Sequence, residues 1–109
     1  MQEQAMALKE RLQQDLQQAL REHDEQRKSA LRLVRAAIVN AEIAKQRELS
    51  DEEILAVIRR EVKQHRESLS EFEKAGRTDL IAEEKAQLEV LLTYLPPQMS
   101  REEITLAVQ

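Results

Sequence analysis

The sequence predicts an all-α fold, an antiparallel bundle of four helices followed by the start of a fifth. Three observations favour this fold class. The 109-residue chain is rich in strong helix formers such as Ala, Leu, Glu, Gln, Arg and Lys, and it has one glycine and two prolines. Apolar residues recur at helical spacings of three and four, and no long stretch alternates with period two. Capping residues stand where the apolar stripes begin or end.

The first predicted helix covers about residues 5–23. Its apolar stripe is narrow, and glutamines and charged residues cover the other faces, which is typical of an amphipathic surface helix. The stripe consists of Leu8, Leu12, Leu16 and Ala19 with Leu20. Asp24 follows as the predicted N-cap of the next helix, because its carboxylate can accept a hydrogen bond from a free backbone amide.

The second predicted helix covers about residues 25–46 and is apolar over more than half of its circumference. One stripe is widened by a second set of apolar residues, so we expect this helix to be central and to contact at least two neighbours. The first stripe contains Leu31, Val34, Ile38 and Ala41, and the second set contains Leu33, Ala36, Ala37 and Ala44.

The third predicted helix is the longest and has the clearest ends. Ser50 and Glu53 form a capping box at its start. Gly76 is the natural residue after its last turn, since glycine enters the left-handed conformation without a Cβ clash. The residues of its apolar seam, which we expect to be buried, are Leu55, Ile58, Val62, His65, Leu69 and Phe72.

The fourth predicted helix begins with Thr78 as its cap, and the two prolines Pro96 and Pro97 end it. Its apolar residues are Ile81, Leu88, Leu91, Leu92 and Leu95. Ser100 and Glu103 then form a second capping box that opens a fifth helix. We therefore predict a bundle over residues 1–97 and the start of a second unit over residues 98–109, which looks cut short.

Composition excludes several kinds of site. The chain has no cysteine, so neither disulfides nor thiolate metal sites can form. No apolar run approaches the roughly 18–20 residues of a membrane span, and the N-terminus lacks the apolar core of a signal peptide. These observations predict a cytoplasmic protein with no membrane partner.

Catalytic chemistry has little support in the sequence. Independent catalysis on a nucleotide-activated substrate would require a nucleophile and a site for the nucleotide, and a chain with one glycine is a poor source of a phosphate-binding loop. His23 and His65 lie on different predicted helices without metal-ligand spacing, and His65 falls on an apolar stripe. We therefore expect no independent catalysis, no cofactor and no metal, and we interpret His65 as a packed, hydrogen-bonded side chain.

Charge is unevenly distributed along the chain. Residues 27–66 contain ten Lys/Arg and six Asp/Glu, whereas residues 78–109 contain two and six, within an overall net charge of −4. The candidate RNA-binding residues fall into two sets at helical spacing, Arg59, Lys63 and Arg66 with Arg60 beside them, and Lys28, Arg32 and Arg35. If the second and third helices pack antiparallel, the two sets could merge into one basic surface that neutralises phosphates.

A simpler alternative is that these cations form ordinary surface ion pairs. Their partners would be Glu48, Glu52, Glu61, Glu67 and the acidic fourth helix. Charge alone does not separate the two interpretations. The lack of exposed aromatic residues argues against stacking on single-stranded bases, and structured RNA contacted through its backbone stays open.

The segment EFEKAGRTDLIAEEKAQLEVLLTYLPPQMSREEI, preceded by LRLVRAAIVNAEI and RELSDEEI, resembles the GatB/YqeY-type family of small bacterial proteins. In that family an N-terminal helical part precedes a small domain similar to the tail of the B subunit of the glutamine-dependent tRNA amidotransferase. This sequence departs from the pattern by ending at Gln109, within the tail-like part.

The resemblance implies an accessory tRNA-linked module that binds structured RNA or a tRNA–enzyme complex without its own catalysis. Two alternatives stay open. In the first, the chain is a protein-interaction or self-association bundle, which the wide apolar circumference of the second helix favours. In the second, the chain is a component of a carbon–nitrogen ligase that uses glutamine as amido-N-donor.

Overall fold

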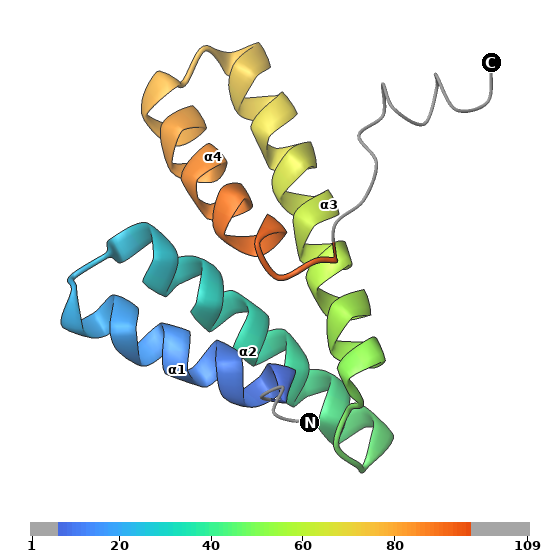
Figure 1. Cartoon of the computed structure of the whole chain (residues 1–109). Helices are drawn as coiled ribbons and strands as arrows, with labels where there is room; N and C mark the ends of the chain where they lie inside the picture. The colour runs from blue at the N-terminus through green and yellow to red at the C-terminus, as the bar shows by residue number, and fades with distance from the viewer. Residues whose placement is uncertain (1–6, 97–109) are drawn as a thin grey trace, which may run out of the picture.

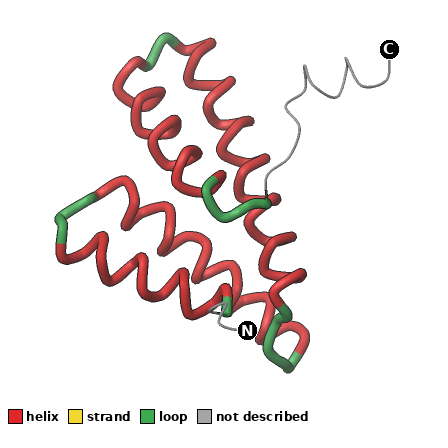
Figure 2. Tube along the Cα trace, in the orientation of Figure 1, coloured by secondary structure: helices red, strands yellow, loops and turns green. Residues whose placement is uncertain are grey.

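The structure is a computed structural model that describes residues 7–96. This part of the chain forms four helices, α1 (Leu8–Arg21), α2 (Glu25–Lys45), α3 (Asp51–Ala75) and α4 (Thr78–Leu92) (Figure 1). Within residues 7–96 there are only helices and loops, which confirms the predicted all-α class (Figure 2). None of these helices combines the length and apolar character that crossing a membrane requires. The predicted fifth helix lies outside the described residues.

The helix ends follow local signals in the sequence. The Asp24 side chain accepts a hydrogen bond from the Arg27 amide at 3.1 Å, and Ser50 and Glu53 form the complete capping box of α3. Gly76 ends α3 with φ of +69°, which glycine adopts without a Cβ clash. Thr78 was predicted as the cap of α4, but Arg77 holds that position without a side-chain cap bond.

The helices form two hairpins, α1 with α2 and α3 with α4, which are inclined to each other rather than aligned as one antiparallel bundle (Figure 1). α3 has 25 residues and α4 has 15, so the first half of α3 extends past the end of α4 (Figure 1). α2 is central, as predicted, because it contacts α1, α3 and α4. The four predicted helices are confirmed, but the predicted antiparallel bundle arrangement is not confirmed.

The core lies between the two hairpins. α2 contributes Leu31, Val34 and Ile38, all buried. The core cluster consists of Leu8, Leu12, Leu16, Ala30, Leu31, Val34, Ile38, Leu49, Ile54, Ile58, Val62, Leu91 and Tyr94. The predicted seam of α3 needs correction, because Leu55, Leu69 and Phe72 are only half-buried, whereas Ile54 is buried.

A polar clasp joins the segment after α4 to α1. The hydroxyl of Tyr94 donates a hydrogen bond to the carboxylate of Asp15 at 2.5 Å. The guanidinium of Arg11 lies over the Tyr94 ring, 4.5 Å from its centroid. Because Tyr94 is buried, this clasp fixes where the chain leaves α4 and therefore where the next residue, Leu95, lies.

Candidate functional site

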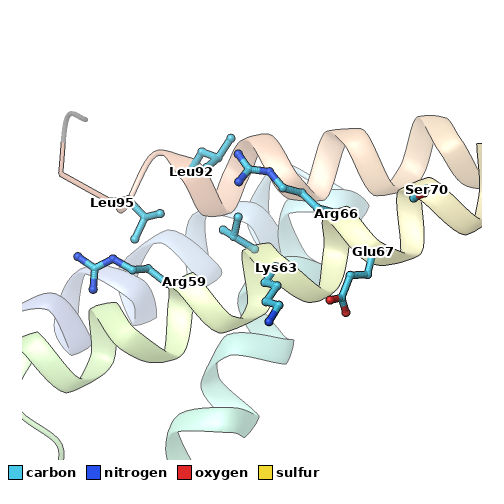
Figure 3. A pocket seen from close by; sticks show the side chains of 8 residues that line it. Arg59, Lys63, Arg66, Glu67, Ser70, Leu92 and Leu95 are labelled. Atoms are coloured by element: carbon cyan, nitrogen blue, oxygen red, sulfur yellow. The ribbon is translucent and has the colours of Figure 1, made fainter. Parts of the chain in front are cut away.

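A groove of about 470 Å³ runs between α3 and the end of α4 (Figure 3). Three cations from α3 form one wall, and the facing wall is formed by Leu92 at the end of α4 and Leu95 in the segment after it. The lining residues are Arg59, Val62, Lys63, Arg66, Glu67, Ser70, Leu92 and Leu95. The groove is therefore basic on one side and apolar on the other.

The three cations occupy one face of one helix because their spacings are four and three. Arg59 and Arg66 are seven residues apart, which corresponds to about 10 Å along the helix axis. Val62, between them in sequence, is buried and anchors this face of α3 to the core. The α3 backbone thus holds Arg59, Lys63 and Arg66 in a fixed row.

The interpretation of these cations as ordinary ion-paired surface charge is not supported. Lys9, Arg11, Arg27, Lys28, Lys45, Arg47, Lys74 and Arg77 all form ion pairs. Arg59, Lys63 and Arg66 form none with any residue in the range 7–96, although Glu67 lies in the same groove. All three are exposed. Within residues 7–96, no carboxylate lies in ion-pair distance of these three cations.

The second predicted set does not join this groove. Lys28 pairs with Glu25, with 2.7 Å between Nζ and Oε1. Arg35 lines a separate groove between α1 and α2, together with Lys9 and Glu42. Arg32 and Arg60 are exposed, and neither lines the groove of α3. Of the second set, only Arg35 thus lines a groove, and it is not the groove that Arg59, Lys63 and Arg66 line.

His65 is buried, as expected, and takes part in a hydrogen-bonded chain across three helices. Its Nδ1 lies 2.9 Å from the carbonyl oxygen of Glu61, and its Nε2 lies 3.1 Å from Oε1 of Gln87. Nε2 of Gln87 donates to Oε1 of Gln26 at 2.8 Å. The part of the chain that the structure describes contains no group of three His, Asp or Glu residues suited to a metal ion.

Comparison with known proteins gives the family. The model of the family described as Yqey-like protein matches residues 9–109. The chain belongs to the YqeY-like family. This confirms the resemblance found in the sequence, and the match includes all residues of the groove.

Three fungal relatives carry the name "Altered inheritance of mitochondria protein 41, mitochondrial". The one from Pyrenophora tritici-repentis is 34% identical over 84 residues, covering 77% of this chain and 46% of the relative. The one from Kluyveromyces lactis is 34% identical over 96 residues, covering 85% and 52%. The one from Saccharomyces cerevisiae (strain YJM789) is 32% identical over 82 residues, covering 74% and 44%.

These relatives bear on two expectations. The chain spans about half the length of the curated relatives it matches. Their names specify mitochondria, which contradicts the cytoplasmic location predicted from the sequence. That prediction rested on the lack of an apolar signal segment. Such a lack argues against secretion, but it does not distinguish the cytoplasm from mitochondria. The relatives are fungal, so the bacterial origin implied by the resemblance stays a prediction.

The sequence interpretation missed the apolar wall of the groove. Leu92 and Leu95 were assigned to the buried face of the fourth helix, but Leu92 is 38% exposed and Leu95 is half-buried. The spacing gave no signal for Leu92. Leu88, Leu91 and Leu95 follow spacings of three and four, and Leu88, Leu92 and Leu95 follow spacings of four and three, so the pattern does not single out Leu92.

Proposed function

We propose that this chain is an accessory helical module that binds structured RNA through the basic wall of the α3 groove and catalyses no reaction itself. The RNA in question is tRNA, free or bound to a tRNA-handling enzyme. One observation carries the proposal. Arg59, Lys63 and Arg66 form a fixed, exposed row without ion pairs to the described residues, whereas most other cations of the fold are paired.

Structured RNA fits this row better than single-stranded RNA does. Single strands are bound by stacking their bases on aromatic side chains. The only aromatic residues of the chain are Phe72, which is half-buried, and Tyr94, which is buried. A row of cations without aromatic side chains for stacking suits the backbone phosphates of a folded RNA. The two arginines add planar guanidinium groups, whose N–H donors match the oxygens of a phosphate.

The family resemblance supports tRNA as the particular RNA. The tail-like part of this family is similar to the tail of the B subunit of the glutamine-dependent tRNA amidotransferase, and residues 98–109 correspond to its beginning. The names of the relatives support mitochondria as the location of this activity. Three phosphate contacts would make binding salt-sensitive, with an affinity loss of roughly 20–40-fold between 50 and 200 mM salt.

Neutralising the basic row tests the proposal. Fluorescence anisotropy with labelled tRNA at low salt would compare the wild-type chain with Arg59→Gln/Lys63→Gln/Arg66→Gln. The matched control is Arg21→Gln/Lys74→Gln/Lys85→Gln, which removes the same charge from exposed positions outside the groove. We expect the first variant to lose most of the affinity and the control to keep it. Equal losses in the two variants would show only a net-charge effect and would contradict the proposal.

Self-association is a second candidate, favoured by a different surface. The apolar surface of α2 is not fully covered. Leu33, which belongs to the predicted apolar set, is 49% exposed, and Val39 and Ile43, which were not in that set, are 48% and 69% exposed. Covering these side chains with a second copy of the chain would remove apolar area from water. Sedimentation equilibrium would test this. A dimer that Leu33→Glu/Ile43→Glu converts to a monomer supports the candidate, and a wild-type monomer at all concentrations rejects it.

A further inference from the structure

The apolar wall of the α3 groove offers nothing to a phosphate. Leu92 is 38% exposed, and Leu95, which lines the same groove, is half-buried. Exposed apolar area of this kind is unfavourable in water, and covering it with an apolar group is favourable. A ligand that fills the whole groove therefore needs anionic groups for the basic wall and an apolar surface for the leucines.

Arg66 brings a flat cationic group to this apolar wall. Its side chain extends from α3 toward Leu92 at the end of α4, and both side chains line the groove (Figure 3). Arg66 is exposed and forms no ion pair with any residue in the range 7–96. A guanidinium plane can stack on the face of a nucleobase, as an aromatic ring does. Arg66 and Leu92 thus give one groove two surfaces that suit the flat face of a base.

The other two cations lie where phosphates are favoured. Arg59 and Lys63 precede Arg66 on the same face of α3. Glu67 follows Arg66 and also lines the groove, and its carboxylate repels phosphates from that end. The groove is therefore divided into a phosphate-binding part at Arg59 and Lys63 and a base-binding part at Arg66 and Leu92.

We propose that the groove binds one unpaired nucleotide of a folded RNA, with the base against Arg66 and Leu92 and the neighbouring phosphates on Arg59 and Lys63. Bases inside a double helix stack on one another, so their faces are hidden from side chains. A base in a loop, a bulge or a free end is unstacked and presents its face. This inference rests on the RNA binding proposed above, and it adds which part of the RNA enters the groove.

Two short RNA duplexes test the proposal. One is fully paired with blunt ends, and the other is the same duplex interrupted by a single bulged adenosine. Fluorescence anisotropy at low salt should give the wild-type chain a roughly fivefold or greater preference for the bulged duplex, the lower end of what stacking one base contributes. Equal affinities for the two duplexes would overturn the proposal and leave RNA binding intact. No affinity for tRNA or for either duplex would reject the proposed function, and this inference with it.

Variants that keep the charge of the basic row locate the base. Arg66→Lys removes the guanidinium plane, and Leu92→Ala removes most of the apolar surface. Each should abolish the preference for the bulged duplex and leave the slope of log affinity against log salt unchanged. Arg59→Lys, in the phosphate-binding part, and Leu33→Ala, at a position 49% exposed on α2 outside the groove, are the controls that should keep the preference.

Two results with these variants would contradict the proposal. A preference that survives in both Arg66→Lys and Leu92→Ala would mean that the base binds elsewhere. If sedimentation equilibrium without RNA shows a dimer that Leu92→Ala converts to a monomer, a second copy of the chain covers the apolar wall and the proposal is wrong. Circular dichroism of each variant, compared with the wild-type chain, reports whether the helical fold is retained.

Discussion

The phenolic hydroxyl of Tyr94 donates a hydrogen bond to the carboxylate of Asp15 and so connects the exit of α4 to α1 at the other end of the sequence. Burial, followed by this hydrogen bond to Asp15, raises the pKa of Tyr94, so its hydroxyl stays protonated and able to donate. Arg27 also approaches Asp15, with 3.7 Å between Nη2 and Oδ1. The bond between Tyr94 and Asp15 positions Leu95, and through it the apolar wall of the groove.

Tyr94→Phe should lower the free energy of unfolding by roughly 1–2 kcal/mol, since it keeps the ring and removes a hydrogen bond to a charged group. Arg11 and Arg27 remain near Asp15, which limits the loss. Urea denaturation followed by circular dichroism would measure it. An unchanged midpoint would mean that the clasp contributes nothing to stability.

Gln87→Leu should destabilise the fold by about 1–3 kcal/mol, because it leaves Nε2 of buried His65 and the amide of Gln26 without a protein partner. Glu89→Leu is the control, since Glu89 is exposed on the same helix. Thermal unfolding of the two variants should differ clearly. Similar melting temperatures would contradict a structural role for the chain from His65 to Gln26.

Acid should weaken the start of α3. Hydrogen bonds from Arg47 and from the Ser50 amide hold the pKa of Glu53 well below its ordinary 4.5. A carboxyl whose pKa is lowered on folding contributes stability above about pH 4.5, and this contribution is lost as the pH falls below that value. Melting temperatures measured from neutral pH downward should therefore decrease below about pH 4.5.

Arg47→Gln should lower the melting temperature at neutral pH and make part of that acid-induced decrease disappear, because the ion pair of Arg47 with Glu53 is then absent at every pH. Arg21→Gln removes an exposed arginine that forms no ion pair among the described residues and should leave the pH profile unchanged. Parallel profiles for wild type and Arg47→Gln would refute the assignment.

Ile58→Ala should cost about 2–5 kcal/mol, since Ile58 is fully buried in the core of α3. Leu69→Ala should cost less, because Leu69 is only half-buried and its loss leaves no closed cavity. Denaturation by urea would rank the two. A larger loss of stability for Leu69→Ala than for Ile58→Ala would support the buried position of Leu69 that the sequence predicts.

The helix ends that depend on residues adjacent in the sequence were predictable from the sequence. Asp24, Ser50 with Glu53, and Gly76 act on backbone groups within a few positions, so they identify helix ends without knowledge of tertiary structure. The rotation of α3 about its axis was not predictable to one residue. Ile54 and Leu55 are both apolar and differ by about 100° around the helix, and only packing in the core selects Ile54.

The candidate site follows the same rule. The row of Arg59, Lys63 and Arg66 was predictable because its members share one helix face. The location of Arg35 in a groove with α1 and the contribution of Leu92 to a groove with α3 were not, because both depend on how the two helices of a hairpin pack side by side. That packing joins residues distant in sequence, which spacing along one helix does not encode.

The most direct test of the central claim is the salt dependence of tRNA affinity for the wild-type chain and the two triple variants described above. If the row contacts phosphates, the slope of log affinity against log salt should become shallower by roughly 2–3 in Arg59→Gln/Lys63→Gln/Arg66→Gln. It should stay at the wild-type value in Arg21→Gln/Lys74→Gln/Lys85→Gln. Identical slopes for all three proteins, or no measurable affinity of the wild-type chain at low salt, would contradict RNA binding by the α3 groove.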